Sequence, residues 1–216
     1  MGESEHMAQR DSETTKQNIL HAVGRVLERD GFRGLGINAI AKEASVGKPL
    51  IYRYFGGMPQ LLEEFGRDAD YWMGLDDMLA EAKRETGGAR PESFAETMRL
   101  VLIIYTRILR SRPLLQEVLA SELTAPTDMV QPLATARRDR AREALTNFMG
   151  DIQWPKDFDG AATFAIMLAG VQYLTLRGRV SEHYWGVPLK TDEDWDRFEK
   201  AVGRMADLAF ASALED

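Results

Sequence analysis

Two short helix-forming segments near the N-terminus constrain this chain more than any other feature. The first fits residues 37–44 and the second fits residues 48–55, with only Ser45, Val46 and Gly47 between them. The apolar residues of the first segment recur at helical spacing: Ile37, Ile40, Ala41 and Ala44. Two helices of about two turns each, joined by such a turn, form the layout that presents the second helix to the major groove of DNA.

The second segment carries the side chains suited to a DNA groove. Gly47 stands at its N-cap position and Gly56 follows its end. Ile51 and Phe55 are expected to face the core, which leaves the polar residues toward solvent or DNA. Amines, guanidinium groups and phenol rings can then contact phosphates and thymine methyl groups. The candidate DNA-binding residues are Asn38, Lys48, Pro49, Leu50, Tyr52, Arg53 and Tyr54. The alternative is a solvated face on a small helical hairpin.

The charge distribution fits a protein that contacts DNA with one end. The whole chain of 216 residues has a net charge of −7, which opposes binding to phosphates. Residues 32–55, however, contain four basic residues and one acidic residue, a local charge of +3. Acidic runs are concentrated elsewhere, as in residues 192–194. The sequence therefore predicts a small positive face on an acidic body.

The rest of the chain also shows helical periodicity, which predicts an all-α fold with three parts. Residues 1–12 are polar, lack the apolar run of a signal peptide, and are expected to form a flexible arm. Residues 13–57 are expected to form the helix-turn-helix domain, whose first helix begins with the capping box Thr14 and Gln17 and stops at Gly31. The apolar stripe of this helix is Ile19, Leu20, Val23, Val26 and Leu27.

Residues 58–216 are expected to form a helical body. Its predicted helices cover residues 59–83, 93–112, 114–123, 133–148, 160–179 and 192–214, with a loop at 86–91. The stretch 160–176 has no charged residue but is shorter than the roughly 20 residues of a membrane span. It therefore predicts a helix that is buried on most sides, in a protein without a membrane partner.

Catalytic and metal-binding patterns are weak throughout. The chain has no cysteine, and its three histidines lack metal-ligand spacing. Gly34, Gly36 and Ala39 match a relaxed dinucleotide motif, but no strand precedes them. Asp157 and Asp159 favour a helix start over a calcium loop. We therefore expect neither an enzyme nor a cofactor.

The sequence resembles the TetR (tetracycline repressor) family of bacterial transcriptional regulators. The resemblance covers roughly the first 65 residues, and its specific part is the spacing of the motif residues around the turn. It is carried by Ile19-Leu20, Gly31-Phe32, the run Ile40 to Lys48, the run Ile51 to Phe55, and Leu61-Leu62.

Several positions depart from the family pattern. Ser45 stands where the family usually has a glycine, at a turn position expected to need a positive φ, which predicts about 1 kcal/mol of strain. Gly47 replaces a serine cap, and Met58 replaces a lysine that contacts phosphate. Leu35 and Gly36 stand where the family prefers a phosphate-binding hydroxyl. The loss of the lysine at position 58 is expected to affect overall affinity for DNA more than docking in the groove.

The resemblance also implies a cytoplasmic homodimer on a palindromic operator. In the family, the last two long helices pair with those of a second copy in a four-helix bundle. The helix from Gly160 fits that role, because it has small residues that permit close approach: Ala161, Ala162, Ala165, Ala169 and Gly170. The alternative is a core helix within one chain.

The family body usually encloses a pocket for a small-molecule effector, whose binding shifts the protein to a state that cannot bind DNA. The candidate lining residues combine apolar faces with polar tips: Trp72, Tyr105, Phe164, Gln172 and Tyr173. Plain core packing is the alternative for each of them. Two functions therefore stay open: a repressor released by a small-molecule effector, or a DNA-binding architectural or corepressor-like protein whose body docks another protein.

Overall fold

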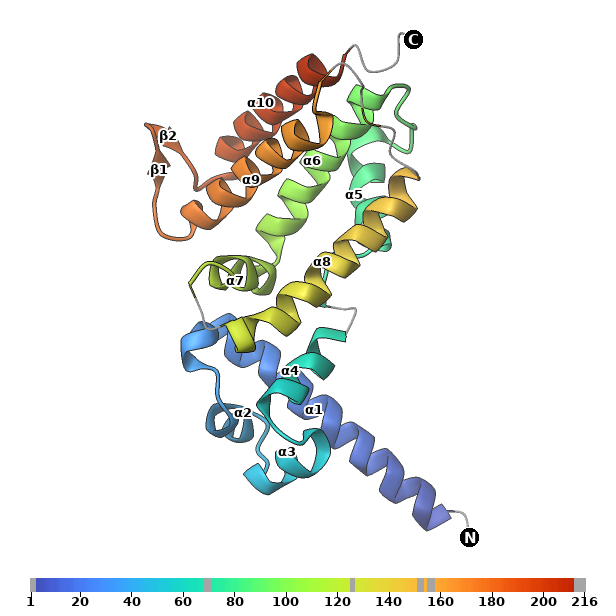
Figure 1. Cartoon of the computed structure of the whole chain (residues 1–216), viewed down its shortest axis with the longest axis vertical. Coiled ribbons are helices and arrows are strands. Elements are labelled where there is room, and N and C mark those ends of the chain that lie inside the picture. Colours follow the sequence, from blue (N-terminus) through green and yellow to red (C-terminus); the bar gives the residue numbers. More distant parts are fainter. Residues whose placement is uncertain (1–2, 68–70, 125–126, 151–153, 155–157, 212–216) are drawn as a thin grey trace. The chain divides into compact units, whose positions relative to one another are not determined.

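The protein is all-α, as predicted, in a computed structural model that describes residues 3–67, 71–124, 127–150, 154 and 158–211. Those residues form ten helices and one short β-hairpin, labelled in Figure 1. The contacts divide the chain into two compact units. The first contains residues 1–72 and 113–139, and the second contains residues 73–112 and 140–216.

The first unit holds the short helices that the sequence predicted. It consists of α1 (Glu3–Gly34), α2 (Ile37–Glu43), α3 (Lys48–Phe55), α4 (Met58–Arg67), α7 (Pro113–Ser121) and the start of α8 (Thr127–Met149). The first helix packs against α2, α4 and α7. The predicted stripe of α1 lies entirely in the core, with exposed fractions of 0 to 5%: Ile19, Leu20, Val23, Val26 and Leu27. Its burial against three helices fixes the positions from which α2 and α3 start.

The first helix begins earlier than predicted. It starts at Glu3, so residues 3–12 are helical, and the predicted start at Thr14 is wrong. The hydroxyl of Thr14 donates to the carbonyl of Arg10 at 2.9 Å, a bond made inside a helix and not at a cap. Residues 3–14 contain neither glycine nor proline, so nothing in this stretch stops the helix from extending. The predicted stop is confirmed, because Gly31 has a φ of 64° and breaks the helix.

The single helix predicted over residues 59–83 is instead two helices. The first, α4, ends at Arg67, and α5 (Leu75–Thr86) begins after Gly74. Gly74 adopts an extended conformation, and its N–H donates to the carboxylate of Asp77 at 2.8 Å. The indole N–H of Trp72 donates to the carbonyl of Gly66 at 2.7 Å. Periodicity continued through this region, but local capping by Gly74 and Asp77 starts a second helix there.

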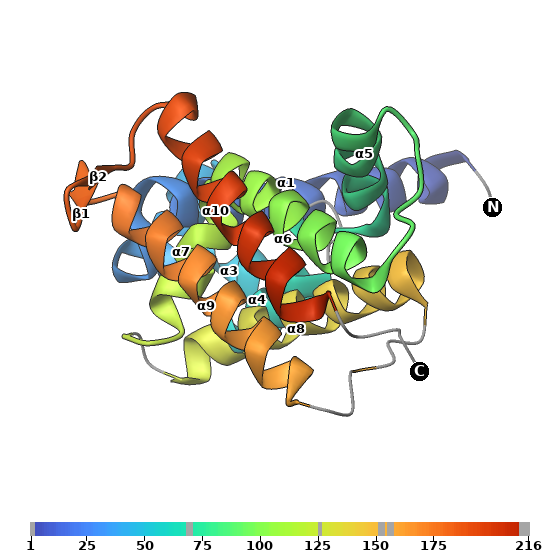
Figure 2. The ribbon, with the colours of Figure 1, turned by 90° about the horizontal axis from the view of Figure 1, so that it is seen from above.

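The second unit is built around α6 (Phe94–Ser111). This helix packs against α5, α9 (Gly160–Gly178) and α10 (Asp192–Phe210), as Figures 1 and 2 show. Half of α6 is buried, including Met98 and Leu102, which pack with Met167 and Val171 of α9. Phe210 of α10 completes this core. The unit therefore has an apolar centre of its own, formed by three long helices.

Side-chain caps explain where these helices begin. The hydroxyl of Ser93 accepts from the N–H of Glu96 at 3.1 Å, which confirms the predicted start of α6. Asp159 caps α9 through the N–H of Ala162 at 2.9 Å, while Asp157 lies outside the described residues. At the start of α10, Thr191 and Asp194 form a capping box. The N–H groups of Thr191 and Lys190 lower the pKa of the Asp194 carboxylate.

Other predicted boundaries move by a few residues. Pro113 begins α7 and does not merely end α6, because a proline at a first helical position loses no hydrogen bond. The helix expected from residue 133 begins at Thr127 and continues through Pro132. Val130 is 3% exposed, so burial extends this helix ahead of the proline. The last helix is helical to Phe210, and its expected end at residue 214 lies outside the described residues.

A small hairpin between α9 and α10 was not predicted. Strands β1 (His183–Tyr184) and β2 (Val187–Pro188) pair antiparallel, with Tyr184 opposite Val187. Trp185 and Gly186 make the turn, both with positive φ. Strands of two residues are too short to show an alternating pattern in the sequence. Within the part of the chain that is described, no helix combines the length and the apolar character needed to cross a membrane.

Candidate nucleic-acid interface

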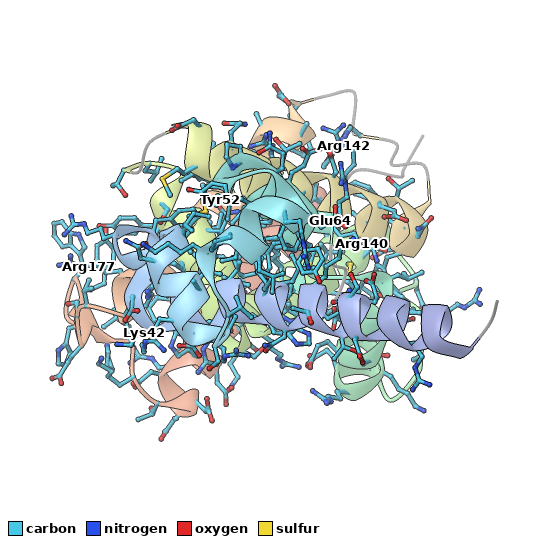
Figure 3. The ribbon with its side chains drawn as sticks, turned by 90° about the horizontal axis from the view of Figure 1, so that it is seen from below. Lys42, Tyr52, Glu64, Arg140, Arg142 and Arg177 are labelled. Atoms are coloured by element: carbon cyan, nitrogen blue, oxygen red, sulfur yellow. The ribbon has the colours of Figure 1, made fainter. Side chains whose placement is uncertain are left out.

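The third helix exposes a polar surface next to a buried apolar one. Ile51 is fully buried and Phe55 is 9% exposed, as predicted. Lys48 and Arg53 are exposed, and the ring of Tyr52 is 53% exposed. Figure 3 shows Tyr52 on this helix as a stick. A large aromatic side chain left in solvent beside two cations is a surface suited to a polyanion with apolar base edges.

The turn before this helix is held in a strained but well-bonded conformation. Ser45 has a φ of 56°, which confirms the prediction of a positive φ at this position. The N–H of Val46 donates to the carbonyl of Ala41 at 2.9 Å. From the first helix, the amide of Asn18 donates to the carbonyl of Ala44, also at 2.9 Å. Asn18 therefore ties the turn directly to α1.

The N-termini of α2 and α3 lack side-chain caps. Gly36 at the start of α2 and Gly47 at the start of α3 make no side-chain cap hydrogen bond, as their lack of a side chain predicts. Met58 is the first residue of α4 and is half-buried. Without hydroxyls or a lysine at these positions, the interface depends more heavily on the cations of α2 and α3.

Glu43, the one acidic residue of residues 32–55, is paired with two arginines of α1. Both carboxylate oxygens of Glu43 accept from arginines: Oε1 from Arg25 at 2.8 Å and Oε2 from Arg29 at 2.7 Å. Hydrogen bonds from Arg29 and then Arg25 lower the pKa of the Glu43 carboxyl. These bonds also link α1 to α2. A carboxylate that would repel phosphate is thereby compensated by two positive charges.

The exposed cations of α2 and α3 have no acidic partner among the described residues. Among the described residues, no carboxylate lies within 4.0 Å of Lys42, Lys48 or Arg53. Some arginines elsewhere in the first unit are paired with acids, as Arg67 is with Glu63 and Arg137 with Glu122. The cations of α2 and α3 thus remain open to a DNA phosphate.

All seven predicted DNA-binding residues lie on these two helices. Asn38 of α2 is exposed, as are four residues of α3, while Leu50 and Tyr54 are half-buried. The exposed residues of α3 are Lys48, Pro49, Tyr52 and Arg53. Sequence reasoning missed Asn18, Arg25 and Arg29, which support the interface from α1. Their polar positions on α1 look like an ordinary solvated face, so only tertiary contacts reveal this role.

The five predicted effector residues do not form one group. Trp72 belongs to the first unit, is 1% exposed, and has its indole N–H bonded to Gly66. In the second unit, the amide of Gln172 donates to the hydroxyl of Tyr105 at 2.8 Å. Tyr105 and Phe164 both pack against the apolar core of that unit. Tyr173 is 52% exposed and contacts Tyr184 of the hairpin.

Two hollows in the second unit are lined by many charged residues. One lies over α5, α6 and α10, and the other over α5, the loop that follows it, and α6. Their volumes are about 390 and 400 Å³, and Glu85, Arg99 and Ile103 line both. Arg107 bridges Glu85 and the buried Glu199 at 2.8 Å each in the first hollow. Positive and negative groups are balanced there, so this network fastens α5 and α10 to α6.

The fold and this surface define a helix-turn-helix protein: a short helix, a tight turn, and a second helix with an exposed basic and aromatic face. Residues 19–65 match the family described as bacterial regulatory proteins, tetR family. This match covers the three-helix segment that carries the interface. The match therefore assigns residues 19–65 to that family.

Known proteins share either this N-terminal region or the fold. The HTH-type transcriptional repressor SCO4008 of Streptomyces coelicolor is 44% identical over 55 residues, which cover 26% of this chain and 29% of that protein. The alignment thus spans less than a third of that repressor.

Two solved structures share the fold of nearly the whole chain. A putative TetR-family regulator from Rhodococcus sp. has a TM-score of 0.57 at 20% identity, covering 89% of this chain and 98% of that one. FadR from Bacillus subtilis, solved with stearoyl-CoA, has a TM-score of 0.56 at 15% identity, covering 88% and 96%. At these identities, the likeness concerns the fold.

Proposed function

We propose that this protein is a sequence-specific DNA-binding transcriptional regulator, and specifically a repressor that a small-molecule effector releases from DNA. Residues 13–57 would form the DNA-binding domain and residues 58–216 the effector-binding and dimerisation domain. The protein acts in the cytoplasm, where bacterial DNA is accessible, and it has no catalytic role in this proposal.

One observation carries the DNA-binding function. The exposed cations of α2 and α3 have no carboxylate within 4.0 Å among the described residues, whereas Glu43 beside them is paired with two arginines. A helix that only faced solvent would gain nothing from keeping its cations unpaired while the acid beside them is paired. A surface that must receive phosphates needs free cations and a neutralised acid.

The test is a salt-dependent binding titration with purified protein. One duplex carries the DNA that flanks the protein's own gene, and the control duplex has the same bases in scrambled order. We expect tighter binding to the native duplex, with affinity falling as salt concentration rises. Equal and weak binding to both duplexes contradicts the proposal for that DNA, and selection from a random library then decides whether any sequence is preferred.

We propose that the regulator is a homodimer joined through α9 and α10. The outer surface of these two packed helices exposes large apolar side chains: Ile166, Tyr173, Met205 and Leu208, with exposed fractions of 71%, 52%, 51% and 64%. The five predicted small residues of α9 are also exposed: Ala161, Ala162, Ala165, Ala169 and Gly170. A second copy can cover this face by close helix packing, and its two-fold symmetry implies a palindromic operator.

The effector site is proposed for the second unit. Tyr105, Phe164 and Gln172 combine aromatic surface with a hydroxyl–amide pair at the edge of the apolar core. Trp154 adds another ring, 6.0 Å from that of Phe164. FadR of B. subtilis shares the fold and was solved with stearoyl-CoA, so long-chain acyl-CoA is the first probe. We expect an effector to weaken DNA binding in the titration above. If acyl-CoA has no effect on binding, other apolar molecules are tested next.

A further inference from the structure

The first helix brings a lysine to the side of the recognition helix. The ammonium of Lys16 lies 5.9 Å from the centre of the Tyr54 ring, over the ring. The guanidinium of Arg53 lies 5.0 Å from the centre of the same ring. Cations within about 6 Å of an aromatic face are attracted by the electron density of the ring. Tyr54 therefore holds two positive charges that come from different helices.

The hydroxyl of Tyr54 is part of the same group. An N–H of Arg53 donates to this oxygen at 3.3 Å. A hydrogen bond from Ser12, and then the one from Arg53, lower the pKa of the hydroxyl, and the charge of Lys16 adds to this effect. Ser12 and Lys16 both lie on α1, in or next to the segment by which this helix extends beyond its predicted start. Two helices thus converge on one oxygen and one ring.

Neither cation is neutralised by an acid. Over the described parts of the chain, no carboxylate lies within 4.0 Å of Lys16 or Arg53. Both lie within 6 Å of the centre of the Tyr54 ring. Each can donate to a phosphate oxygen, and neither needs a particular base to do so.

We propose that Lys16, Arg53 and Tyr54 form a phosphate clamp that binds the DNA backbone beside the groove occupied by α3. The proposal rests on the DNA-binding function proposed above, and it assigns a DNA contact to α1, outside the helix-turn-helix. It also supplies a cation for the DNA backbone in a protein that has Met58, and no lysine, at the start of α4.

The test compares Lys16→Ala with Lys83→Ala by titration at several salt concentrations. Lys83 is an exposed lysine on α5, so its replacement removes the same charge from the second unit. A lost phosphate contact lowers the slope of log affinity against log salt by about 0.9, which is roughly a threefold smaller loss of affinity between 50 and 200 mM salt. We expect this change for Lys16→Ala, equally on native and scrambled duplexes, and none for Lys83→Ala.

Lys16→Arg serves as the rescue variant, because a guanidinium can also stack on the ring and bind phosphate. We expect it to keep the slope of the unchanged protein. Equal slopes for Lys16→Ala and Lys83→Ala overturn the clamp, as does a loss confined to the native duplex. If the unchanged protein prefers neither duplex, sequence-specific regulation fails, but the slopes of non-specific binding still decide the clamp. Thermal unfolding of each variant confirms that the comparison is made between folded proteins.

Discussion

At the scale of single residues, Lys48 and Tyr52 are the side chains best placed to test DNA binding. Both are exposed on α3, and neither contributes to the core, which Ile51 and Phe55 form. We expect Lys48→Ala or Tyr52→Ala to weaken binding to a preferred duplex by roughly 5- to 150-fold, the range of one good polar or apolar contact. Circular dichroism melting should be unchanged. Normal affinity in the folded double variant contradicts the placement of α3 in the groove.

Ser45 is the residue where local strain can be measured directly. Its φ of 56° lies in the left-handed region, where a side chain costs about 1 kcal/mol and glycine costs less. We expect Ser45→Gly to raise the free energy of unfolding by up to about 0.5 kcal/mol, since the greater entropy of glycine in the unfolded chain offsets part of the gain. Urea unfolding measures the difference. Ser45→Ala is the control, and a gain as large as that of glycine argues against strain at this turn.

At the scale of elements, the contact between α1 and α2 depends on the ionised carboxylate of Glu43. Hydrogen bonds from Arg29 and Arg25 lower its pKa below the ordinary value of 4.5. The folded state therefore binds this proton less readily than the unfolded state. The stabilisation is present above the ordinary pKa and is lost as the pH falls through the lowered value.

We therefore expect the pH dependence of stability to change in Glu43→Gln. Near pH 7 the unchanged protein should be the more stable of the two, and the difference should shrink as the pH is lowered from about 5 to 3. Urea unfolding across this range provides the measurement. Glu63→Gln, at an exposed carboxylate paired within α4, is the matched control. A difference between the two proteins that is independent of pH rules out the ionised form of Glu43 as the cause.

At the scale of the whole molecule, the exposed face of α9 determines whether two copies associate. Ala169 and Gly170 are exposed at its middle, and a Cβ added at Gly170 would meet nothing within 4 Å. We expect Ala169→Arg to leave each chain folded and to produce a monomer, because a bulky charge prevents close approach of helices. Sedimentation velocity measures the mass. Ala80→Arg on the exposed side of α5 is the control. A dimer that persists in Ala169→Arg places the interface elsewhere.

Much of the structure of α2, the turn and α3 follows from short-range sequence features. The bounds of α3 agree with the prediction at both ends, and α2 ends one residue earlier than predicted, because Gly47, Gly56 and the apolar spacing act within one or two turns. The positive φ at Ser45 was expected because the family that the sequence resembles usually has a glycine at this position. The caps of α6 and α10 are equally local. In such places, adjacent residues decide the backbone conformation.

Tertiary structure alone decided which distant residues meet. The break between α4 and α5 falls inside a periodic apolar pattern, and the burial of Trp72 against Gly66 is not encoded by spacing. Asn18 reaches the turn, Arg25 and Arg29 reach Glu43, and Lys16 reaches Tyr54, all from a helix whose polar face looks solvated in sequence. Local propensity acts over a few residues, whereas these contacts join residues 14 to 38 positions apart, and only packing of the helices can bring them together.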